Sequence, residues 1–340
     1  KFISIFQLEK IKSYRKEYGD IQFLEELYEI EGLDDKSIQM IKDIICFEDN
    51  KVKNMSIRDL KYGKHKIILQ SDQCLNMKKG YHDIEDSILY QNPNSIYLGS
   101  PQRLYIRYNY TYKDKIEYGF VAEKDPGEYL FKNSVNDSII MLLGDKCYNG
   151  FDFYTFHIVI HNFGFLFETL AIGDYKISFG QGLCMGSGMA FTSKGGSLIR
   201  RSKKITASKS ANEVYYQRGI ASTLKYKDLE LSIFYSKKQV DANIVTYDSL
   251  NETPLKISSL QQSGLHRTFN EIMDRKVINQ ELYGLNLSYR NSNIQLGYTL
   301  HKTGLGAELN PNNNIYNLFH FKGKTLTNQS IDFYHIRDKI

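Results

Sequence analysis

The stretch LYGLNLSYRNSNIQLGYTLHK, residues 282–302, carries the pattern that decides the fold. Apolar and polar side chains alternate up to Arg290, residues 291–293 are of types that favour tight turns, and the alternation then resumes. Because successive side chains of a β-strand point to opposite faces, this hairpin has one apolar and one polar face. The apolar face consists of Tyr283, Leu285, Leu287, Tyr289, Ile294, Leu296, Tyr298 and Leu300. The polar face consists of Gly284, Asn286, Ser288, Arg290, Gln295, Gly297, Thr299 and His301.

Three further stretches follow the same plan, at residues 103–122, 153–173 and 219–238. Their tight turns fall near residues 114, 163 and 228. The connections between hairpins are long and cover residues 124–150, 181–214, 237–280 and 301–317. Short turns alternating with long loops are typical of transmembrane β-barrels, whose strands have ~9 to 11 residues and end in aromatic girdles. Tyrosines lie near the turns, as that girdle requires, at Tyr110, Tyr112, Tyr226 and Tyr289.

The sequence therefore predicts a mainly β protein, an antiparallel up-and-down β-barrel of the outer-membrane type that is incomplete as it stands. The apolar face is expected to contact lipid. A soluble antiparallel sheet with one wet face would show the same alternation, and this alternative stays open at the level of sequence.

In a barrel, the polar face would line the lumen. The candidate lumen-lining residues are Arg103, Arg107, His157, His161 and Arg290. His157 and His161 share a strand face, but four residues of a strand span ~13 Å, too far for both imidazoles to bind one metal ion. We predict neither a metal site nor a cofactor.

Charge is distributed unevenly along the 340 residues, whose formal net charge is +5. Residues 20–50 hold ten acidic residues against Lys36 and Lys42, a local balance of −8. The 41% hydrophobic content is enough for a folded chain. No apolar run reaches the ~18 residues of a membrane helix. The four cysteines are widely spaced and form no metal-binding motif.

Residues 1–50 have helical rather than strand periodicity. Apolar residues recur every three or four positions, at Leu8, Ile11 and Tyr14, then Phe23, Leu27 and Ile30, then Ile38, Ile41 and Ile45. Three short helices fit this pattern. The segment IEGLDD, residues 30–35, separates the last two: Gly32 is suited to positive φ and Asp34 is placed to cap the next helix.

This arrangement resembles the helix-hairpin-helix modules of competence and repair proteins, which bind the DNA backbone. The resemblance makes Gly32, Leu33 and Asp34 the candidate binding residues. Backbone N–H groups of such a hairpin approach a phosphate, usually beside Lys or Arg. Here the acidic balance would repel a duplex, so we predict a protein partner and disfavour nucleic acid. We expect the module to dock against the periplasmic mouth of the barrel through Glu31, Asp34 and Asp35. DNA uptake through this module is the alternative function.

The whole chain resembles the helix-hairpin-helix outer-membrane proteins of Bacteroidota. The matching stretches are YLGSPQRLYIRYNY, FVAEKDPGE, LAIGDYKISFGQGLCMGSGMAF, KKQVDANI, SSLQQSGLHRT and FKGKTLTN, between residues 97 and 328. The resemblance implies a helical module at 1–50 on the periplasmic side, a linker with first strands at 51–96, and a barrel segment at 97–340 that continues past Ile340. It implies a Gram-negative outer membrane, lipid and envelope-protein partners, and a role in envelope structure, assembly or transport.

Catalytic motifs are weak in this sequence. The glycine-rich segment at 173–188 lacks the Lys–Ser/Thr ending of a phosphate-binding loop, and its glycines are interpreted as easing a tight strand bend or an inward loop. Ser259, Ser263 and His266 are the residue types of a hydrolase, but their spacing supplies neither an orienting acid nor an oxyanion site. We therefore predict a protein that is not an enzyme.

Overall fold

A computed structural model describes residues 3–18, 21, 24–42, 57–82, 84–186, 203–248, 253–291 and 293–335. Several sequence-based expectations lie outside these residues. They concern Ile45 and Cys46, most of the basic run at 199–204, Ser292 of the last tight turn, and a further turn after residue 335.

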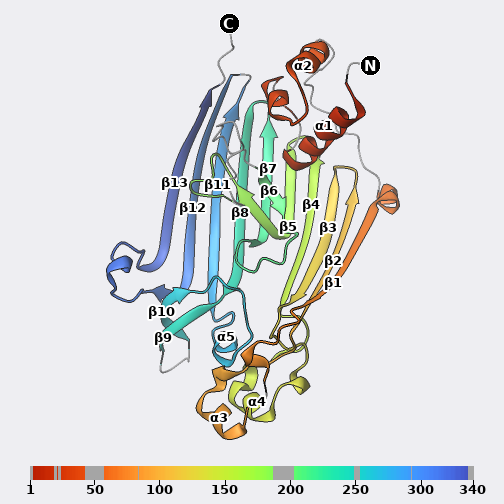
Figure 1. The fold of residues 1–340 in the computed structure, drawn as a ribbon. Helices are drawn as coiled ribbons and strands as arrows, with labels where there is room; N and C mark the ends of the chain where they lie inside the picture. Colours follow the sequence, from red (N-terminus) through yellow and green to blue (C-terminus); the bar gives the residue numbers. More distant parts are fainter. Residues whose placement is uncertain are drawn as a thin grey trace.

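One large sheet of 13 strands dominates the described residues (Figure 1). The strands are β1 (Lys64–Gln73), β2 (Gln102–Tyr112), β3 (Ile116–Lys124), β4 (Phe153–Phe163), β5 (Phe167–Ser178), β6 (Lys204–Ala207), β7 (Gln217–Tyr226), β8 (Leu229–Val240), β9 (Ala242–Tyr247), β10 (Pro254–Leu260), β11 (Ile278–Arg290), β12 (Ile294–Leu309) and β13 (Gly323–His335). The prediction of a mainly β chain is confirmed.

The principal path of the sheet is antiparallel and runs β1-β2-β3-β4-β5-β7-β8-β11-β12-β13. Three short strands branch from it: β6 pairs with β5, β10 pairs in parallel with the end of β12, and β9 pairs with β10. The sheet is not closed within the described chain, because β1 and β13 form its two edges. An antiparallel-dominated, open sheet is thus established.

The four tight turns lie where alternation predicts them, with one small shift. Lys113 and Lys227 adopt left-handed backbone at φ 48° and 53°, which the short turns after β2 and β7 require. The second turn was expected at residues 162–164. Instead β4 extends to Phe163, paired with Phe167, and the chain reverses over residues 164–166 starting at Gly164, whose φ is +78°.

The long connections contain more regular structure than the sequence pattern indicates. The expected loop at 237–280 holds the β9–β10 hairpin and helix α5 (Phe269–Met273), which begins with a capping box between Thr268 and Glu271. Helix α3 (Asp86–Gln91) lies in the connection between β1 and β2, and helix α4 (Asp137–Leu143) lies in the connection between β3 and β4. A separate apolar cluster holds these helices together, and we call it the cap: Leu89, Leu98, Tyr129, Val135, Ile139, Leu143 and Ile272.

The N-terminal part is helical, with a correction to the middle element. It comprises α1 (Ile5–Tyr18), a 3-10 helix η1 (Leu24–Glu29) and α2 (Asp35–Lys42), so the second expected helix is a single short 3-10 segment. Leu27, Ile30, Ile38 and Ile41 form its buried core. Further 3-10 helices are η2 (Ile57–Tyr62), η3 (Lys79–Tyr81), η4 (Pro93–Ser95), η5 (Lys132–Ser134), η6 (Gly144–Lys146) and η7 (Ile315–Asn317).

The two ends of the sheet carry different structures (Figure 1). We call the end of the sheet that carries the tight turns the turn end, and the N-terminal helices lie beside it (Figure 1). Ion pairs between described residues connect them to the rest of the chain: Arg290 Nη2 lies 3.0 Å from Glu26 Oε1, and Lys203 Nζ lies 3.1 Å from Glu17 Oε1. The cap lies at the opposite end, which we call the loop end.

One face of the sheet is apolar and exposed. Residues directly opposite in neighbouring antiparallel strands share a face, and one such row runs from β3 to β11: Tyr118, Ile158, Ile172, Ile220, Tyr235 and Tyr283. Ile220, Tyr235 and Tyr283 are 42–48% exposed. We call this side the exposed face.

The opposite, inner face is largely covered and mostly polar. Its buried polar residues include His157, Thr223, Ser232, Ser236 and Thr299. Where the chain after β5 folds back, an apolar cluster also forms on this face, in which Ile205 of β6 packs with Tyr175, Phe234 and Leu282. The inward-loop interpretation of the glycine-rich segment agrees with this packing for the residues up to 186.

Two of the four expected girdle tyrosines are buried instead of exposed. Tyr110 is 2% and Tyr112 6% exposed. Gly63 packs directly against the Tyr110 ring, where any side chain would clash, and the Tyr110 hydroxyl donates to the Leu60 carbonyl. The linker before β1 therefore covers these rings, whereas Tyr226 and Tyr289 remain exposed.

Candidate functional site

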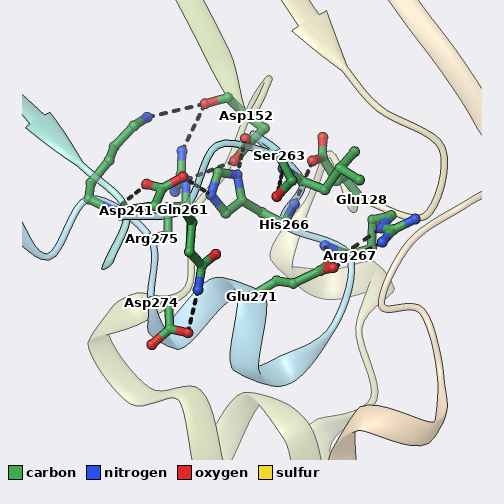
Figure 2. A network of polar contacts seen from close by, with 12 residues as sticks. Glu128, Asp152, Asp241, Gln261, Ser263, His266, Arg267, Glu271, Asp274 and Arg275 are labelled. Atoms are coloured by element: carbon green, nitrogen blue, oxygen red, sulfur yellow. Dashed lines mark hydrogen bonds and ion pairs between the residues drawn. The ribbon is translucent and has the colours of Figure 1, made fainter. Parts of the chain in front are cut away.

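A buried ionic cluster lies at the loop end, where four separate connections meet (Figure 2). Glu128 follows β3, Asp152 precedes β4, Asp241 lies between β8 and β9, and His266 lies between β10 and α5. Glu128, Asp152 and His266 are each at most 1% exposed. Charged groups are buried this completely only when they are paired, so the partners of each group determine what the cluster does.

His266 is held between two carboxylates. Its Nδ1 lies 2.6 Å from Asp152 Oδ2 and its Nε2 lies 2.9 Å from Asp241 Oδ2. A ring that donates from both nitrogens is the imidazolium form. Burial alone would lower the pKa of His266, but the two hydrogen bonds and charges outweigh it and raise the pKa to about 10.

Two further cations complete the charge balance around Asp152. Arg275 Nε lies 2.8 Å from Asp152 Oδ1, and its Nη2 donates to the Asp152 carbonyl at 2.8 Å. Lys276 donates from Nζ to the same carbonyl at 3.3 Å and from its backbone N–H to Asp241 Oδ1 at 2.8 Å. Burial opposes ionisation of Asp152, but His266 and the other cations hold its pKa below the ordinary value.

The Glu128 carboxylate accepts hydrogen bonds from backbone N–H groups instead of pairing with a cation. Its two carboxylate oxygens accept from the N–H groups of His266 at 2.9 Å and Asp125 at 2.7 Å. The neighbouring Gly127, at φ +98°, allows the tight turn that brings the carboxylate back to Asp125. Burial, followed by repulsion from Asp152, raises the pKa of Glu128 to about 7. The residue ties the β3 connection to the one that carries His266.

Glu128, Asp152 and His266 each offer one atom within 4.8 Å of the others, the spacing of a metal site. The protonation of His266 argues against that use, since an imidazolium has no lone pair for a metal. Arg275 already supplies positive charge to Asp152. The donor set therefore fits an internal ion network better than a bound cation, and the absence of a metal stays a prediction.

The hydrolase residues noted in the sequence are not brought into a catalytic arrangement. Both nitrogens of His266 face aspartates, leaving none for a serine. Ser263 Oγ accepts from Leu265 N–H at 3.4 Å, and Ser259 Oγ accepts from Asn243 Nδ2 at 2.6 Å. His266 consequently cannot act as the base of a serine nucleophile here.

A cavity of about 280 Å³ adjoins the cluster and shares Asp241 and Lys276 with it. Its wall also includes Glu213, Gln217 and Lys238. Burial raises the pKa of Glu213 to about 9, with the charge of Asp152 adding to the effect. Neither the cluster nor the cavity is evident from sequence pattern.

The five candidate lumen-lining residues are spread over the inner face and do not form one site. Arg103 pairs with Glu123 and, at 3.4 Å, with Asp72 near the loop end, and Arg107 donates to the Lys209 carbonyl at 3.5 Å. Arg290 contacts the helical module through Glu26 at the opposite end. Their role in a lumen stays a prediction.

The two histidines bond to different groups but lie near the same charged pair, Glu117 and Lys209. His157 is fully buried, with Nε2 3.7 Å from Glu117 Oε1, and Glu117 also pairs with Lys209. His161 Nδ1 lies 3.2 Å from Thr169 Oγ1.

The hairpin of the helical module has the expected backbone conformation, but its polar groups already form hydrogen bonds with other residues of the module. Gly32 has φ +91°, and Asp34 Oδ1 accepts from Ser37 N–H at 3.2 Å as a helix cap. The Leu33 N–H donates to Ile30, and the Gly32 carbonyl accepts from Gln7 Nε2 of α1 at 3.0 Å. The local geometry agrees with the sequence, whereas its use in binding is still a prediction.

No protein-family model, curated protein or solved structure matches this chain. Among the helices that the structure describes, none combines the length and apolar composition required to cross a membrane.

Proposed function

We propose that this chain forms part of a non-enzymatic outer-membrane β-barrel protein with a periplasmic helical module, serving envelope structure, assembly or transport. The observation that carries the proposal is the distribution of side chains between the two faces of the sheet. In a water-soluble sheet with one wet face, the covered face is apolar and the wet face polar. Here the exposed face holds the aliphatic and aromatic side chains, and buried polar residues lie on the inner face.

The exposed apolar residues form a continuous surface rather than scattered positions. Rows of opposed residues extend across neighbouring strands, such as Leu231, Leu287, Tyr298 and Ile331 across β8, β11, β12 and β13. Soluble monomers rarely expose connected apolar patches above a few hundred Å². Lipid contact accounts for this surface, since barrels alternate apolar residues outward and polar residues inward.

The edges of the sheet agree with the same interpretation. β1 and β13 are long, uncovered strands, and β13 exposes Ile331 and Phe333. Such edges invite pairing with other strands, and soluble proteins normally shorten or cover them. A membrane barrel has no free edge, so the proposal requires strand partners for β1 and β13.

The two ends suggest an orientation. Outer-membrane barrels have short turns on the periplasmic side and longer loops outside. The tight turns and the helical module share one end, and the cap and ionic cluster occupy the other (Figure 1). We therefore assign the helical module to the periplasm and the ionic cluster to the outer surface.

The helical module is proposed to contact protein rather than DNA. Its acidic residues Glu17 and Glu26 already pair with Lys203 and Arg290 at the turn end. At the hairpin, Glu31 pairs with Lys10 at 2.8 Å within the module. A phosphate would meet carboxylates there instead of uncompensated cations, which makes nucleic-acid binding unfavourable.

Cell fractionation tests the proposal. The protein should remain with outer membranes after carbonate extraction, and recovery in the soluble fraction would contradict the assignment. As a second test, Ile233→Arg on the exposed face should cost about 2–4 kcal/mol of folding free energy if it lies near the bilayer midplane. Gln295→Arg, on the half-buried inner face near the turn end, is the matched control and should cost much less.

A further inference from the structure

The cavity at the loop end has the features of a small-molecule site that the barrel proposal does not use. It has a volume of about 280 Å³ and lies between the ends of β5, β8 and β10 and the segment before β7. Ligand pockets generally span about 300–1,000 Å³, so this one suits a ligand at the small end of that range.

Two hydrogen-bonding groups in its wall lack partners. The Gln217 side-chain oxygen is buried and has no hydrogen-bond partner among the described residues. The half-buried Glu213 carboxyl likewise accepts no hydrogen bond within that part of the chain. Buried polar groups are nearly always paired in folded proteins, so the unpaired Gln217 oxygen indicates where a ligand can donate, and the half-buried Glu213 carboxyl of the same wall is available to that ligand.

The cations in the wall are already engaged. Lys238 Nζ donates to the Val214 and Tyr216 carbonyls at 2.8 and 2.7 Å. Lys176 Nζ donates to Ser210 Oγ at 2.9 Å, and Lys276 contacts Asp152. An anionic ligand would have to compete for these ammonium groups, which disfavours phosphates and carboxylates.

The rest of the wall combines neutral hydrogen-bonding side chains with aliphatic and aromatic residues, and its remaining carboxylate, Asp241, is already paired with His266. Gln239, Gln262 and Gln280 contribute amides that both donate and accept, and Tyr215 is a largely exposed aromatic side chain. With its pKa raised to about 9, Glu213 is protonated near neutral pH and can also donate. This combination matches a ligand with several hydroxyl groups, each of which donates and accepts, and with an apolar ring face.

We propose that this cavity binds a small neutral sugar, with hydroxyl groups donating to Gln217 Oε1 and the Glu213 carboxyl. The site is built from the strand ends and connections at the loop end. It goes beyond the proposed membrane function and does not depend on it.

Saturation-transfer NMR and calorimetry on the purified full chain test the inference. The probes are glucose, galactose, N-acetylglucosamine and their disaccharides, with glycine, lysine and inorganic phosphate as competing classes. A detergent without a sugar head group is needed, because a glycoside detergent would occupy the site. At least one sugar should bind with a dissociation constant below about 10 mM, the range of weak small-ligand sites.

Variants locate the binding and separate the ligand classes. Gln217→Ala should weaken sugar affinity about tenfold, the equivalent of one lost hydrogen bond, and Gln295→Ala on distant β12 should not change it. Glu213→Gln should retain affinity within about threefold, because an amide replaces a protonated carboxyl as donor and acceptor. Circular dichroism verifies that each variant is folded. Failure of all sugars to bind, or preferential binding of an amine or phosphate, would overturn the proposal.

Discussion

The turn end and the loop end of the sheet are both held by charges, but in different environments. At the turn end, the pair Glu17–Lys203 joins half-exposed side chains with 56% and 39% exposure. At the loop end, His266 and Asp152 are almost completely buried. Exposed ion pairs contribute little and are screened by salt, whereas removing one partner of a buried pair is costly. We therefore expect the Glu17–Lys203 contact of the helical module to be weaker and more sensitive to salt than the buried cluster beside the cap.

Removing the central cation of the cluster should have the largest effect. His266→Ala leaves Asp152 and Asp241 without their shared partner, so we expect a loss of about 3–5 kcal/mol in the stability of the loop end. Urea unfolding and limited proteolysis of residues 124–150 measure it. His82→Ala, at an exposed histidine, is the control. Equal stability of the His266 variant and the unmodified protein would show that the cluster does not hold the cap.

Raising the pH should weaken the same end. The folded-state pKa of His266 lies above its ordinary value of 6.5, so its stabilising contribution is complete below pH about 6.5 and is lost as the pH rises toward about 10. The raised pKa values of Glu128 and Glu213 act in the same direction but from pH 4.5 upward, to about 7 for Glu128 and about 9 for Glu213, because burial disfavours their ionised forms. Unfolding midpoints of the unmodified protein should therefore fall between pH 6.5 and about 10, where the loss from His266 adds to that from Glu213. Unfolding midpoints that do not change with pH would show that the charged form of His266 does not stabilise the loop end.

Breaking the turn-end contact should have a smaller, salt-sensitive effect. Lys203→Gln removes an ammonium group that pairs with Glu17, and we expect up to about 1 kcal/mol of weaker docking because both side chains are well exposed. Protease sensitivity of the segment between the helices and β1 reports it. Lys10→Gln breaks the Lys10–Glu31 pair and the contact of Lys10 with the Phe6 ring, both inside the module, and should leave docking unchanged. Docking that resists 1 M salt, where the screening length is ~3 Å, would contradict an ionic attachment.

Chelation should have no effect on the loop end. Because His266 is held as an imidazolium between two aspartates, the cluster needs no metal for its charge balance. Thermal unfolding with and without a chelator should coincide. A lower midpoint after chelation, restored by a divalent cation, would instead make Glu128, Asp152 and His266 a metal site.

The strands and turns were predictable because alternation and turn chemistry are local properties. The exposure of particular residues was not predictable. Tyr110 alternates like its neighbours, but the linker before β1 covers it, and the sequence pattern does not predict where that linker lies. The charge balance of residues 20–50 suggested docking through Glu31, Asp34 and Asp35. In the structure Glu31 and Asp34 stabilise the module itself, and Glu17 and Glu26 make the outward contacts.

The ionic cluster was missed because its contacts are remote in sequence. His266 and Asp152 are 114 residues apart, and no local pattern links them. Glu128, Asp241 and His266 lie in the stretches FVAEKDPGE, KKQVDANI and SSLQQSGLHRT. Each stretch carries ionisable residues into a connection that alternation treats as a loop, and this shared feature is the available signal that the connections could meet in one buried group.

The central claim is that the apolar face of the sheet contacts lipid, and lipid quenching of a fluorescent label tests it most directly. Single cysteines at Leu287 and Ser288, neighbours on opposite faces of β11, would carry the label in a chain whose own cysteines are replaced; Leu287 is exposed and Ser288 is half-buried. In vesicles with brominated acyl chains, the label at 287 should be strongly quenched and the label at 288 little affected. Equal quenching at both positions, or none at 287, would contradict the account.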